Sequence, residues 1–200
     1  MKGLQWLLII LFCAILIQAS PISVASGASA TSSADEWTTF RHDPSHSGTT
    51  TGGDLTDSVK PLWNFSTRAA VWSSPAVVNG CVLVGCKDCN IYCLNASNGQ
   101  PLWNFQTEGE VNSSPAIYNG FVYVGCDDGW VYCVNFATGM QQWKMKVGGL
   151  VRSSPTLLDG CVYVGSGDHD FFCFNATDGN AIWTYPTQYR VDSSPACQMV

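Results

Sequence analysis

Four cysteines are spaced so that they could form disulfide bonds. Residues 87–90 predict a turn between two antiparallel strands, and this pairing would put Cys86 and Cys93 on one face, on a diagonal. Cys126 and Cys133 repeat the spacing. Diagonal neighbours lie near the upper distance limit for a disulfide, and a buried cysteine also serves as a small apolar side chain. Bridging and simple packing are therefore both open for these residues.

A zinc site is a further interpretation of the first of these segments. Cys86, Cys89 and Cys93 have a spacing that occurs among zinc ligands. Forty and eighty residues further along, however, Gly129 and His169 stand in place of Cys89. A single hairpin would then have to gather every ligand, so we expect no metal here.

Two other groups of polar residues could take part in chemistry. The run from Arg41 to His46 contains two histidines and an aspartate, which suits metal binding or acid–base chemistry, but Asp43-Pro44-Ser45 is also ordinary turn sequence. The second group could bind Ca²⁺ as a ring of carboxylates, or could simply form turns. It consists of Asp88, Asp127, Asp128, Asp168 and Asp170.

A period of forty residues defines the elements that must position these side chains. Two features recur at this interval with no insertion or deletion. They are a tryptophan, at Trp63, Trp103, Trp143 and Trp183, and the tripeptide Ser-Ser-Pro, at 73–75, 113–115, 153–155 and 193–195. The repeat also favours packing over bridging for the cysteines, because Ser166 stands where Cys86 and Cys126 would be and leaves Cys173 without that partner.

Each unit predicts four short strands and no helix. In the first unit we expect strands at 74–78, 81–84, 91–95 and 102–105. Asn79-Gly80 between the first two supplies the positive φ that a tight hairpin turn requires.

The second strand of each unit is apolar on both faces, as at 122–124 and 162–164. A sheet with one wet face would alternate, so both faces must be covered. Four-stranded sheets stacked radially achieve this, and a period near forty is typical of them. The sequence therefore predicts an all-β fold, a β-propeller with four-stranded antiparallel blades.

The segment from Cys93 to Trp103 resembles the tryptophan-docking motif of PQQ-repeat β-propellers, Ala-x-Asp-x-x-Thr-Gly-x-x-x-Trp. It recurs at 133–143 and 173–183, and it departs from the family pattern with Cys for Ala and Asn for Asp. The resemblance implies that each indole lies flat on the peptide near the motif glycine, between neighbouring blades. The residues so implied are Trp63, Trp103, Trp143, Trp183, Gly99, Gly139 and Gly179.

The repeat predicts an incomplete propeller over residues 61–200. Complete blades are expected at 71–106, 111–146 and 151–186, a closing strand at 61–66, and the start of another blade at 191–200. Closed propellers usually have about four to eight blades. We therefore expect a fragment of a longer protein, with closure by association as the alternative.

The N-terminal part predicts export. Residues 1–30 read as a signal peptide with a twelve-residue apolar run at 6–17, which is short for a bilayer span; an uncleaved anchor is the alternative. Residues 31–60 are expected to form a flexible spacer and a lead-in segment. Within them, the pattern around Trp37, Phe40 and Asp43 resembles the lead-in before the first blade of related propellers. We expect a secreted, cell-surface or periplasmic protein.

Charge and loop variation narrow the partners. The net charge is −6 and the nine Lys and Arg are scattered, so neither a nucleic acid nor an anionic membrane surface is expected as partner. The loops that leave the second and fourth strands meet at one end and vary between units, whereas the other end repeats. We expect a protein or peptide to bind this variable face, with Trp130, Tyr189 and Arg190 as exposed anchors.

Two classes of function fit the resemblance. The first is a non-enzymatic scaffold that binds proteins, similar to outer-membrane assembly lipoproteins of the BamB type, with no cofactor. The alternative is a fragment of a quinoprotein dehydrogenase that uses pyrroloquinoline quinone (PQQ) and Ca²⁺ to oxidise an alcohol or sugar. The adjacent cysteine pair of many such enzymes does not occur in this chain. Because fold does not fix function, we favour the scaffold.

Overall fold

The computed structural model describes residues 36–49 and 60–197. The signal peptide predicted at 1–30, and the parts of the spacer at 31–35 and 50–59, lie outside these residues. The described residues form twelve β-strands and no helix, so none of them builds a helix that could span a bilayer.

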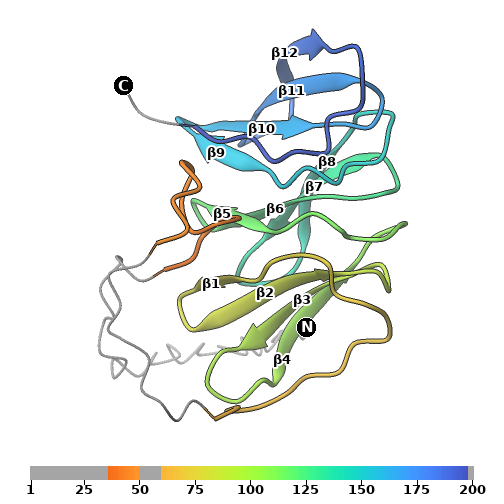
Figure 1. Ribbon diagram of the computed structural model, residues 1–200. Coiled ribbons are helices and arrows are strands. Elements are labelled where there is room, and N and C mark those ends of the chain that lie inside the picture. The colour runs from red at the N-terminus through yellow and green to blue at the C-terminus, as the bar shows by residue number, and fades with distance from the viewer. Residues whose placement is uncertain (1–35, 50–59, 198–200) are drawn as a thin grey trace, which may run out of the picture. The chain divides into compact units, whose positions relative to one another are not determined.

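The strands make three antiparallel sheets of four, each in chain order (Figure 1). The first sheet contains β1 (Ala76–Val78), β2 (Cys81–Cys86), β3 (Asn90–Asn95) and β4 (Pro101–Gln106). The second contains β5 (Ala116–Tyr118), β6 (Phe121–Gly125), β7 (Trp130–Asn135) and β8 (Gln141–Lys146). The third contains β9 (Thr156–Leu158), β10 (Cys161–Gly165), β11 (Asp170–Asn175) and β12 (Ala181–Pro186). These are the predicted blades, and they confirm the partial β-propeller.

The turn between the first two strands of each blade has the predicted conformation. Asn79 and Gly80 have φ values of 50° and 71°, and the two later blades repeat this with Asn119, Asp159 and their following glycines. Both central residues with positive φ define the hairpin turn whose twist matches the strands. The two-residue turn thus sets the register Val78↔Cys81 at the start of β2.

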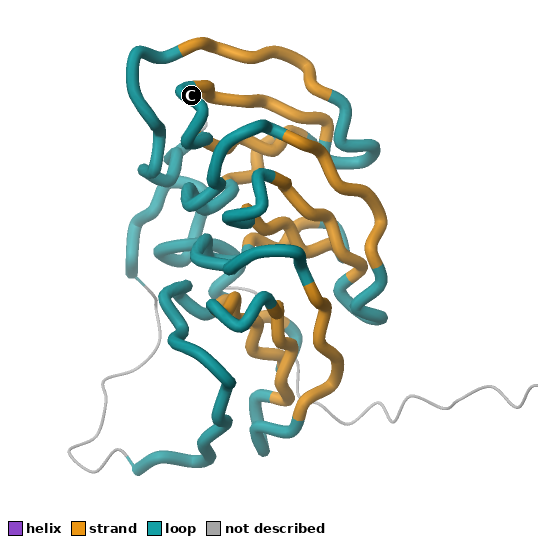
Figure 2. Tube along the Cα trace, turned by 90° about the vertical axis from the view of Figure 1, so that its right-hand side faces the viewer, coloured by secondary structure: helices purple, strands orange, loops and turns teal. Residues whose placement is uncertain are grey.

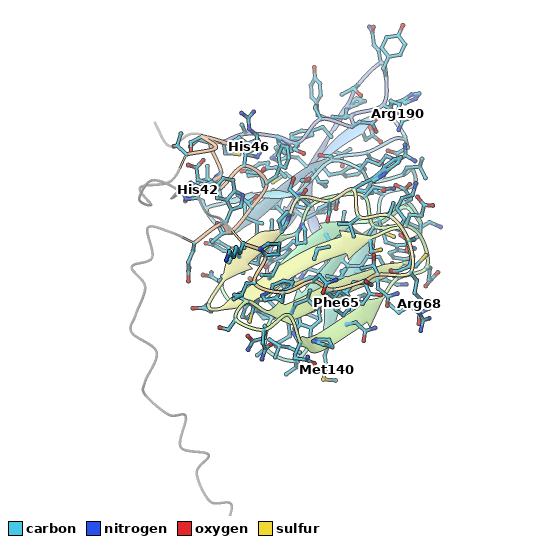
Figure 3. All side chains as sticks on the ribbon, turned by 60° about the horizontal axis from the view of Figure 1, so that its bottom comes forward. His42, His46, Phe65, Arg68, Met140 and Arg190 are labelled. Atoms are coloured by element: carbon cyan, nitrogen blue, oxygen red, sulfur yellow. The ribbon has the colours of Figure 1, made fainter. Side chains whose placement is uncertain are left out.

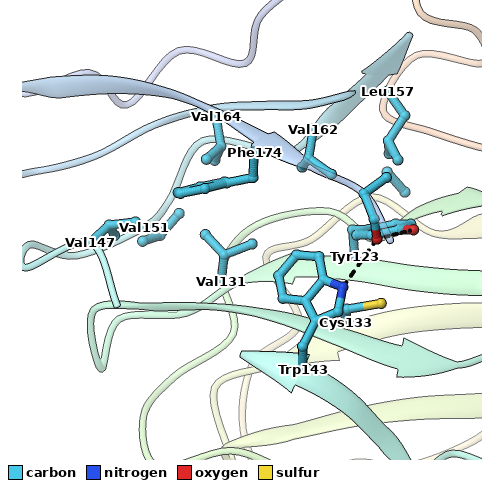
Figure 4. Packing of buried hydrophobic residues seen from close by; sticks show 12 residues of the cluster. Tyr123, Val131, Cys133, Trp143, Val147, Val151, Leu157, Val162, Val164 and Phe174 are labelled. Carbon is cyan, nitrogen blue, oxygen red and sulfur yellow. Dashed lines mark hydrogen bonds between the residues drawn. The ribbon is translucent and has the colours of Figure 1, made fainter. Parts of the chain in front are cut away.

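The middle blade is covered on both faces. Val122, Tyr123 and Val124 in β6 are all buried, which is the observation that the apolar second strand predicted. One face packs against the first blade and the other against the third, in two separate apolar clusters. Figure 4 shows the cluster between the second and third blades, where Val131 of β7 lies opposite Phe174 of β11.

Serine side chains join the first strands of neighbouring blades. The backbone N–H of Ser74 donates to Oγ of Ser114 at 2.9 Å, and Ser114 donates in the same way to Ser154. The preceding serine stays within its own blade, since Oγ of Ser113 bonds both the N–H and the carbonyl of Gly125. The repeated Ser-Ser pair therefore satisfies buried backbone groups both within and between blades.

A lead-in segment, residues 36–49, lies along the first strands of successive blades. Trp37 exchanges two backbone hydrogen bonds with Val77 of β1, and the Ile117 N–H of β5 donates to the carbonyl of Thr38. Oγ1 of Thr39 donates to the carbonyl of Pro155 in the third blade at 3.4 Å. The segment therefore contacts all three blades. Figure 2 shows that the described residues consist of strands and loops only.

The two incomplete blades differ from the prediction in one respect. Neither the expected closing strand, 61–66, nor the described part of the next blade, 191–197, is paired as a strand. A β-strand is defined by hydrogen bonds to a neighbouring strand, and no described strand forms such bonds with either segment. Residues 61–66 are nevertheless held by the side chain of Trp63, as described below.

Candidate functional site

Three tryptophans lie between consecutive sheets. The indole N–H of Trp63 donates to the carbonyl of Ala96 at 2.7 Å, that of Trp103 to Phe136 at 2.8 Å, and that of Trp143 to Ala176 at 3.0 Å. Each acceptor belongs to the blade that follows in the chain. Figure 4 shows the last of these bonds as a dashed line from the Trp143 ring.

The motif glycines lie directly against these rings. A methyl group at Gly99, Gly139 or Gly179 would come within 2.6 to 2.8 Å of the indole of Trp63, Trp103 or Trp143, which is closer than real contacts allow. The three glycines also have φ near +71 to +75°. Close approach and backbone conformation therefore both require glycine at these positions.

Trp183 occupies the same position in the third blade but has a different environment. It is 43% exposed, and its described neighbours are Tyr163 and Phe171 of its own blade. No described residue accepts a hydrogen bond from its indole. Exposed Ile182 and Tyr185 lie beside it on β12, so the outer edge of the third blade is apolar.

The asparagine that replaces the motif aspartate caps the turn after the third strand. Oδ1 of Asn95 accepts from the Ser97 N–H at 2.8 Å, and Asn135 and Asn175 form the equivalent bonds in the other blades. An amide oxygen fulfils the same acceptor role as a carboxylate here. The substitution thus preserves the motif.

The expected arrangement of Cys86 with Cys93 is wrong. Cys86 pairs with Asn90 and Cys93 with Leu83, so the two cysteines are an odd number of positions apart and point to opposite faces. The prediction assumed a four-residue turn, whereas the turn contains three, and a slip of one residue reverses the face. Cys126 and Cys133 are separated in the same way, because Cys133 pairs with Tyr123. All four cysteines are buried, and no two of them are bonded to each other.

The zinc interpretation fails for the same reason. Cys93 faces away from Cys86, and Cys89 has a φ of 65° at a turn position that Gly129 and His169 fill with φ of 85° and 75°. Cys89 therefore fills a turn position that requires a positive φ, which glycine and histidine fill in the other blades. Among the described residues, no group of three or more His, Cys, Asp or Glu is placed to hold a metal ion.

The aspartates at these turns accept hydrogen bonds from neighbouring loop and strand residues. Oδ2 of Asp88 accepts from the Arg68 N–H at 3.1 Å and from the Tyr92 hydroxyl at 2.8 Å. These hydrogen bonds lower the pKa of Asp88 despite partial burial, which acts in the opposite direction. Asp128 makes the equivalent bonds to Glu108 and Tyr132. These carboxylates tie two loops together rather than forming a ring.

The histidines near the N-terminus serve the lead-in segment. His42 contacts Asp43 at 3.4 Å and the ring of Trp37, while Nε2 of His46 lies 3.3 Å from Oγ1 of Thr156 in the third blade. Burial lowers the pKa of His46. These contacts position the segment and do not converge on one reacting centre.

The two sets of variable loops meet at one end of the blades, here called the loop face. Each loop before a first strand is bonded to the following turn between second and third strands, as in Lys87 N–H to the Ala70 carbonyl and Asp127 N–H to the Glu110 carbonyl. The loop face comprises residues 67–72, 87–90, 107–112, 127–130, 147–152, 167–170 and 187–192. Figure 3 shows Arg68 and Arg190, from the first and last of these loops, along the same side.

Charged side chains connect the blades across the loop face. Lys87 of the first blade contacts Glu110 at 3.0 Å, and Arg152 at the third blade contacts Asp127 of the second at 2.9 Å. Asn112 also donates to Asp127 at 2.9 Å. The hydrogen bond to Asp127 raises the pKa of Arg152, so the guanidinium remains charged. The loop face is therefore an ordered surface of alternating charge.

The three predicted anchors have different environments. Tyr189 is 78% exposed and its ring is free. Arg190 is paired with Asp192 at 2.7 Å. Trp130 is half-buried, with the ammonium of Lys144 4.4 Å from its ring centroid, so it presents only part of its surface.

Trp72 is an exposed aromatic residue of the loop face that was not among the predicted anchors. It is 64% exposed, and Nζ of Lys87 lies 3.8 Å from the ring centroid. The signal was available, because Asn112 and Arg152 occupy the equivalent positions of later blades and Trp72 is thus an aromatic residue outside the repeat. The preceding residue is a repeated valine; in the next blade it is Val111, which packs against Gly85.

The family of the chain follows from a match to a family model. The model is described as outer membrane protein assembly factor BamB, and it matches residues 51–143 and 90–198. The chain therefore belongs to this family of PQQ-repeat β-propellers. A comparison with curated proteins found no significant match.

Solved structures of the same fold include enzymes, assembly factors and designed proteins. A quinohemoprotein alcohol dehydrogenase from Pseudomonas putida is 19% identical with a TM-score of 0.68, covering 76% of this chain and 26% of the enzyme. BamB from Moraxella catarrhalis is 18% identical with a TM-score of 0.56, covering 62% and 39%. The computationally designed Ika4 protein is 18% identical with a TM-score of 0.61, covering 68% and 86%.

The similarity at this level of identity concerns the fold. The chain spans 26% of the dehydrogenase and 39% of BamB, which are the first two of these structures. Both an enzyme and an assembly factor thus contain blades of the same fold as those of this chain, so the blades alone do not assign a function.

Proposed function

We propose that this chain is part of an exported, non-enzymatic propeller that binds a protein or peptide through its loop face. Its family is described as an outer membrane assembly factor, which supports a role in the cell envelope. The opposite end supports the choice of face, because its turns are nearly the same in every blade, with Gly80, Gly120 and Gly160 each accepting a bond from the turn before the fourth strand. Recognition requires differences, and these gather on the loop face.

The observation that carries the proposal is the pair of exposed aromatic side chains on the loop face. Trp72 and Tyr189 stand at its two ends, and neither repeats in the other blades. Tryptophan and tyrosine are enriched among the residues that anchor protein interfaces. The charged contacts of Lys87 and Arg152 hold the loops in place between them, so the surface is ordered before a partner arrives.

Selection of binding peptides tests the proposal. A phage-displayed library of random peptides is selected on the chain, and the affinity of the selected peptides is measured for two variants. Replacing both anchors, Trp72→Ala with Tyr189→Ala, should weaken binding about tenfold or more. The matched control is Met140→Ala, an equally exposed apolar residue in a turn at the other end. Equal binding to all variants would contradict the proposal.

The dehydrogenase alternative has its own test. The similarity in fold to a quinohemoprotein alcohol dehydrogenase supports it, although only at the level of the blades. The protein is incubated with PQQ and Ca²⁺, passed over a desalting column and examined for quinone absorbance. Under the scaffold proposal no quinone is retained. Stoichiometric retention would replace the scaffold with the enzyme.

A further inference from the structure

The pairing register places Cys93 on the opposite face from Cys86 and on the same face as another cysteine, Cys81. Cys81 lies opposite Asn95, and Cys93 lies opposite Leu83, so Cys81 and Cys93 share a face as diagonal neighbours. The N–H of Asn95 donates away from β2, to the carbonyl of Gln100. Cys81 and Asn95 are therefore a non-hydrogen-bonded pair, the kind in which two antiparallel strands approach most closely.

The third blade repeats this arrangement. Cys161 lies opposite Asn175, and Cys173 lies opposite Tyr163. The N–H of Asn175 again donates to the next strand, to the carbonyl of Asn180. Two blades thus carry a cysteine at the start of the second strand and another on the same diagonal of the third.

The side chains of each pair are neighbours on one face of the sheet, because Cys81 and Cys93 occupy adjacent diagonal positions of the register, and so do Cys161 and Cys173. In each pair the residue on the third strand is fully buried, whereas its partner is half-buried and reachable from solvent. Burial raises the pKa of Cys93 to about 12 and that of Cys173 to about 11.

The middle blade provides a natural comparison. Phe121 stands where the outer blades have Cys81 and Cys161, so Cys133 has no cysteine on its diagonal. Cys133 lies directly opposite Tyr123 in the register. Packing alone explains a buried cysteine on the third strand of every blade. It does not explain the half-buried cysteine at the start of the second strand, which the two outer blades have and the middle blade lacks.

We propose that Cys81 with Cys93, and Cys161 with Cys173, form two diagonal disulfide bonds within the first and third blades. Each bond forms when two thiols lose two protons and two electrons to a disulfide oxidant, either a small molecule or a protein. The oxidant is reduced to two thiols, so atoms and electrons balance. A diagonal in a flat sheet exceeds the usual Cα separation of a disulfide, so the start of the second strand must move slightly toward the third.

The raised pKa values determine how the bonds form. Thiolate is the attacking species, and little of it exists at neutral pH when the thiol pKa is about 11 or 12. The folded, reduced chain should therefore oxidise slowly, while the unfolded chain, with ordinary thiols, should oxidise readily. The bonds are expected to form during folding.

Peptide mapping tests the assignment without any substitution. The reduced chain is refolded in a mixture of reduced and oxidised glutathione, its free thiols are alkylated, and it is digested with chymotrypsin. Cleavage after Leu83 and Tyr92 separates Cys81, Cys86 and Cys93 into different peptides. Mass spectrometry should find Cys81 linked to Cys93, and Cys161 linked to Cys173. Linkage of Cys93 to Cys86, or no linkage at all, would overturn the proposal.

Thiol counting with matched variants gives a second measurement. Oxidative refolding should remove two titratable thiols for each pair, four in all. Cys81→Ser should reduce this loss by two, whereas Cys86→Ser and Cys126→Ser, which change cysteines facing away from the pairs, should not change it. Far-UV circular dichroism confirms that each variant folds. An equal loss in Cys81→Ser and the unchanged chain would show that Cys81 is not a partner.

Discussion

The second and third blades have almost the same sequence at their docking positions but differ in how far these are buried. Trp143 is 9% exposed and Trp183 is 43% exposed, although both end the same motif. Tyr123 is buried and its hydroxyl donates to the carbonyl of Ala176, while Tyr163 remains partly open. The strands and turns within the two blades match. The difference arises from the neighbouring blades, because within the described residues only the second blade has a complete blade on each side.

This comparison indicates that a blade of this type depends on its neighbours to cover its apolar faces. Its apolar faces are completed by the next blade, so the energy that holds the chain together lies largely at the junctions. The effect of a substitution on stability should therefore depend on whether the residue lies between two complete blades, and not on its position within the forty-residue repeat. The following predictions test this from the largest expected effect to the smallest.

Removal of the indole should separate the two blades most clearly. We expect Trp143→Ala to lower the free energy of unfolding by about 3–5 kcal/mol, because it empties a packed junction and leaves the carbonyl of Ala176 without its donor. The same change at Trp183 should lower it by about 1 kcal/mol or less, as for a surface position. Urea unfolding measures both. Equal losses would show that stability is a property of each blade.

A methyl group on the glycine under the indole should have the next largest effect. Gly179 and Gly160 both have φ near +75°, so an alanine at either costs about 1–2 kcal/mol for the backbone. At Gly179 the methyl group would also meet the ring of Trp143, adding about 1–3 kcal/mol, whereas nothing lies within 4 Å at Gly160. The difference between Gly179→Ala and Gly160→Ala in thermal unfolding isolates the contact.

The serine between blades should show the same contrast on a smaller scale. Oγ of Ser154 accepts the buried N–H of Ser114, and Ser154→Ala should cost about 1–3 kcal/mol by leaving that N–H without a partner. Ser194 accepts from Ser154 in the same way but is only half-buried. Water can replace it, so Ser194→Ala should cost a few tenths of a kcal/mol by chemical denaturation. A larger effect at Ser194 would contradict this order.

The smallest effect is a dependence on alkaline pH in the first blade. Burial, together with the hydrogen bond to Asp88, raises the pKa of Tyr92 to about 12. Because the folded pKa exceeds the unfolded value of about 10, this contribution to stability is complete below pH 10 and is lost as pH rises to 12. Tyr92→Phe should flatten that decline. The third blade already has Phe172 at this position, so Phe172→Tyr is the reciprocal test.

The repeat alone predicted the fold, but it did not predict which face each residue occupies. The spacing of the tryptophans and the positive-φ turns defined the blades, their four strands and the two-sided burial of β6. The register of β2 with β3 depends on whether the turn after Cys86 contains three or four residues. A glycine would have indicated the positive-φ position of a three-residue turn, but in the first blade that position is Cys89. One residue decided whether Cys93 faces Cys86 or Cys81.

The two sets of variable loops lie together, as expected, but the environments of their side chains were less predictable. Trp130 was predicted as an exposed anchor because such residues dominate interfaces, yet Lys144 from the neighbouring strand covers part of it. Trp72 follows a repeated valine and has no aromatic counterpart in the other blades. Exposure depends on neighbours that are distant in the sequence, and these follow only from the packing.

The lead-in segment has a consequence for the order of events in folding. Thr39 meets Pro155 across 116 positions of the chain, and Trp37 meets Val77 across a much shorter stretch. Contacts that close long loops are slow, so the hairpins of each blade should assemble before this segment docks. The lead-in segment, although synthesised before these three blades, would then be the last part to dock, and its docking would mark the completed assembly of the three blades.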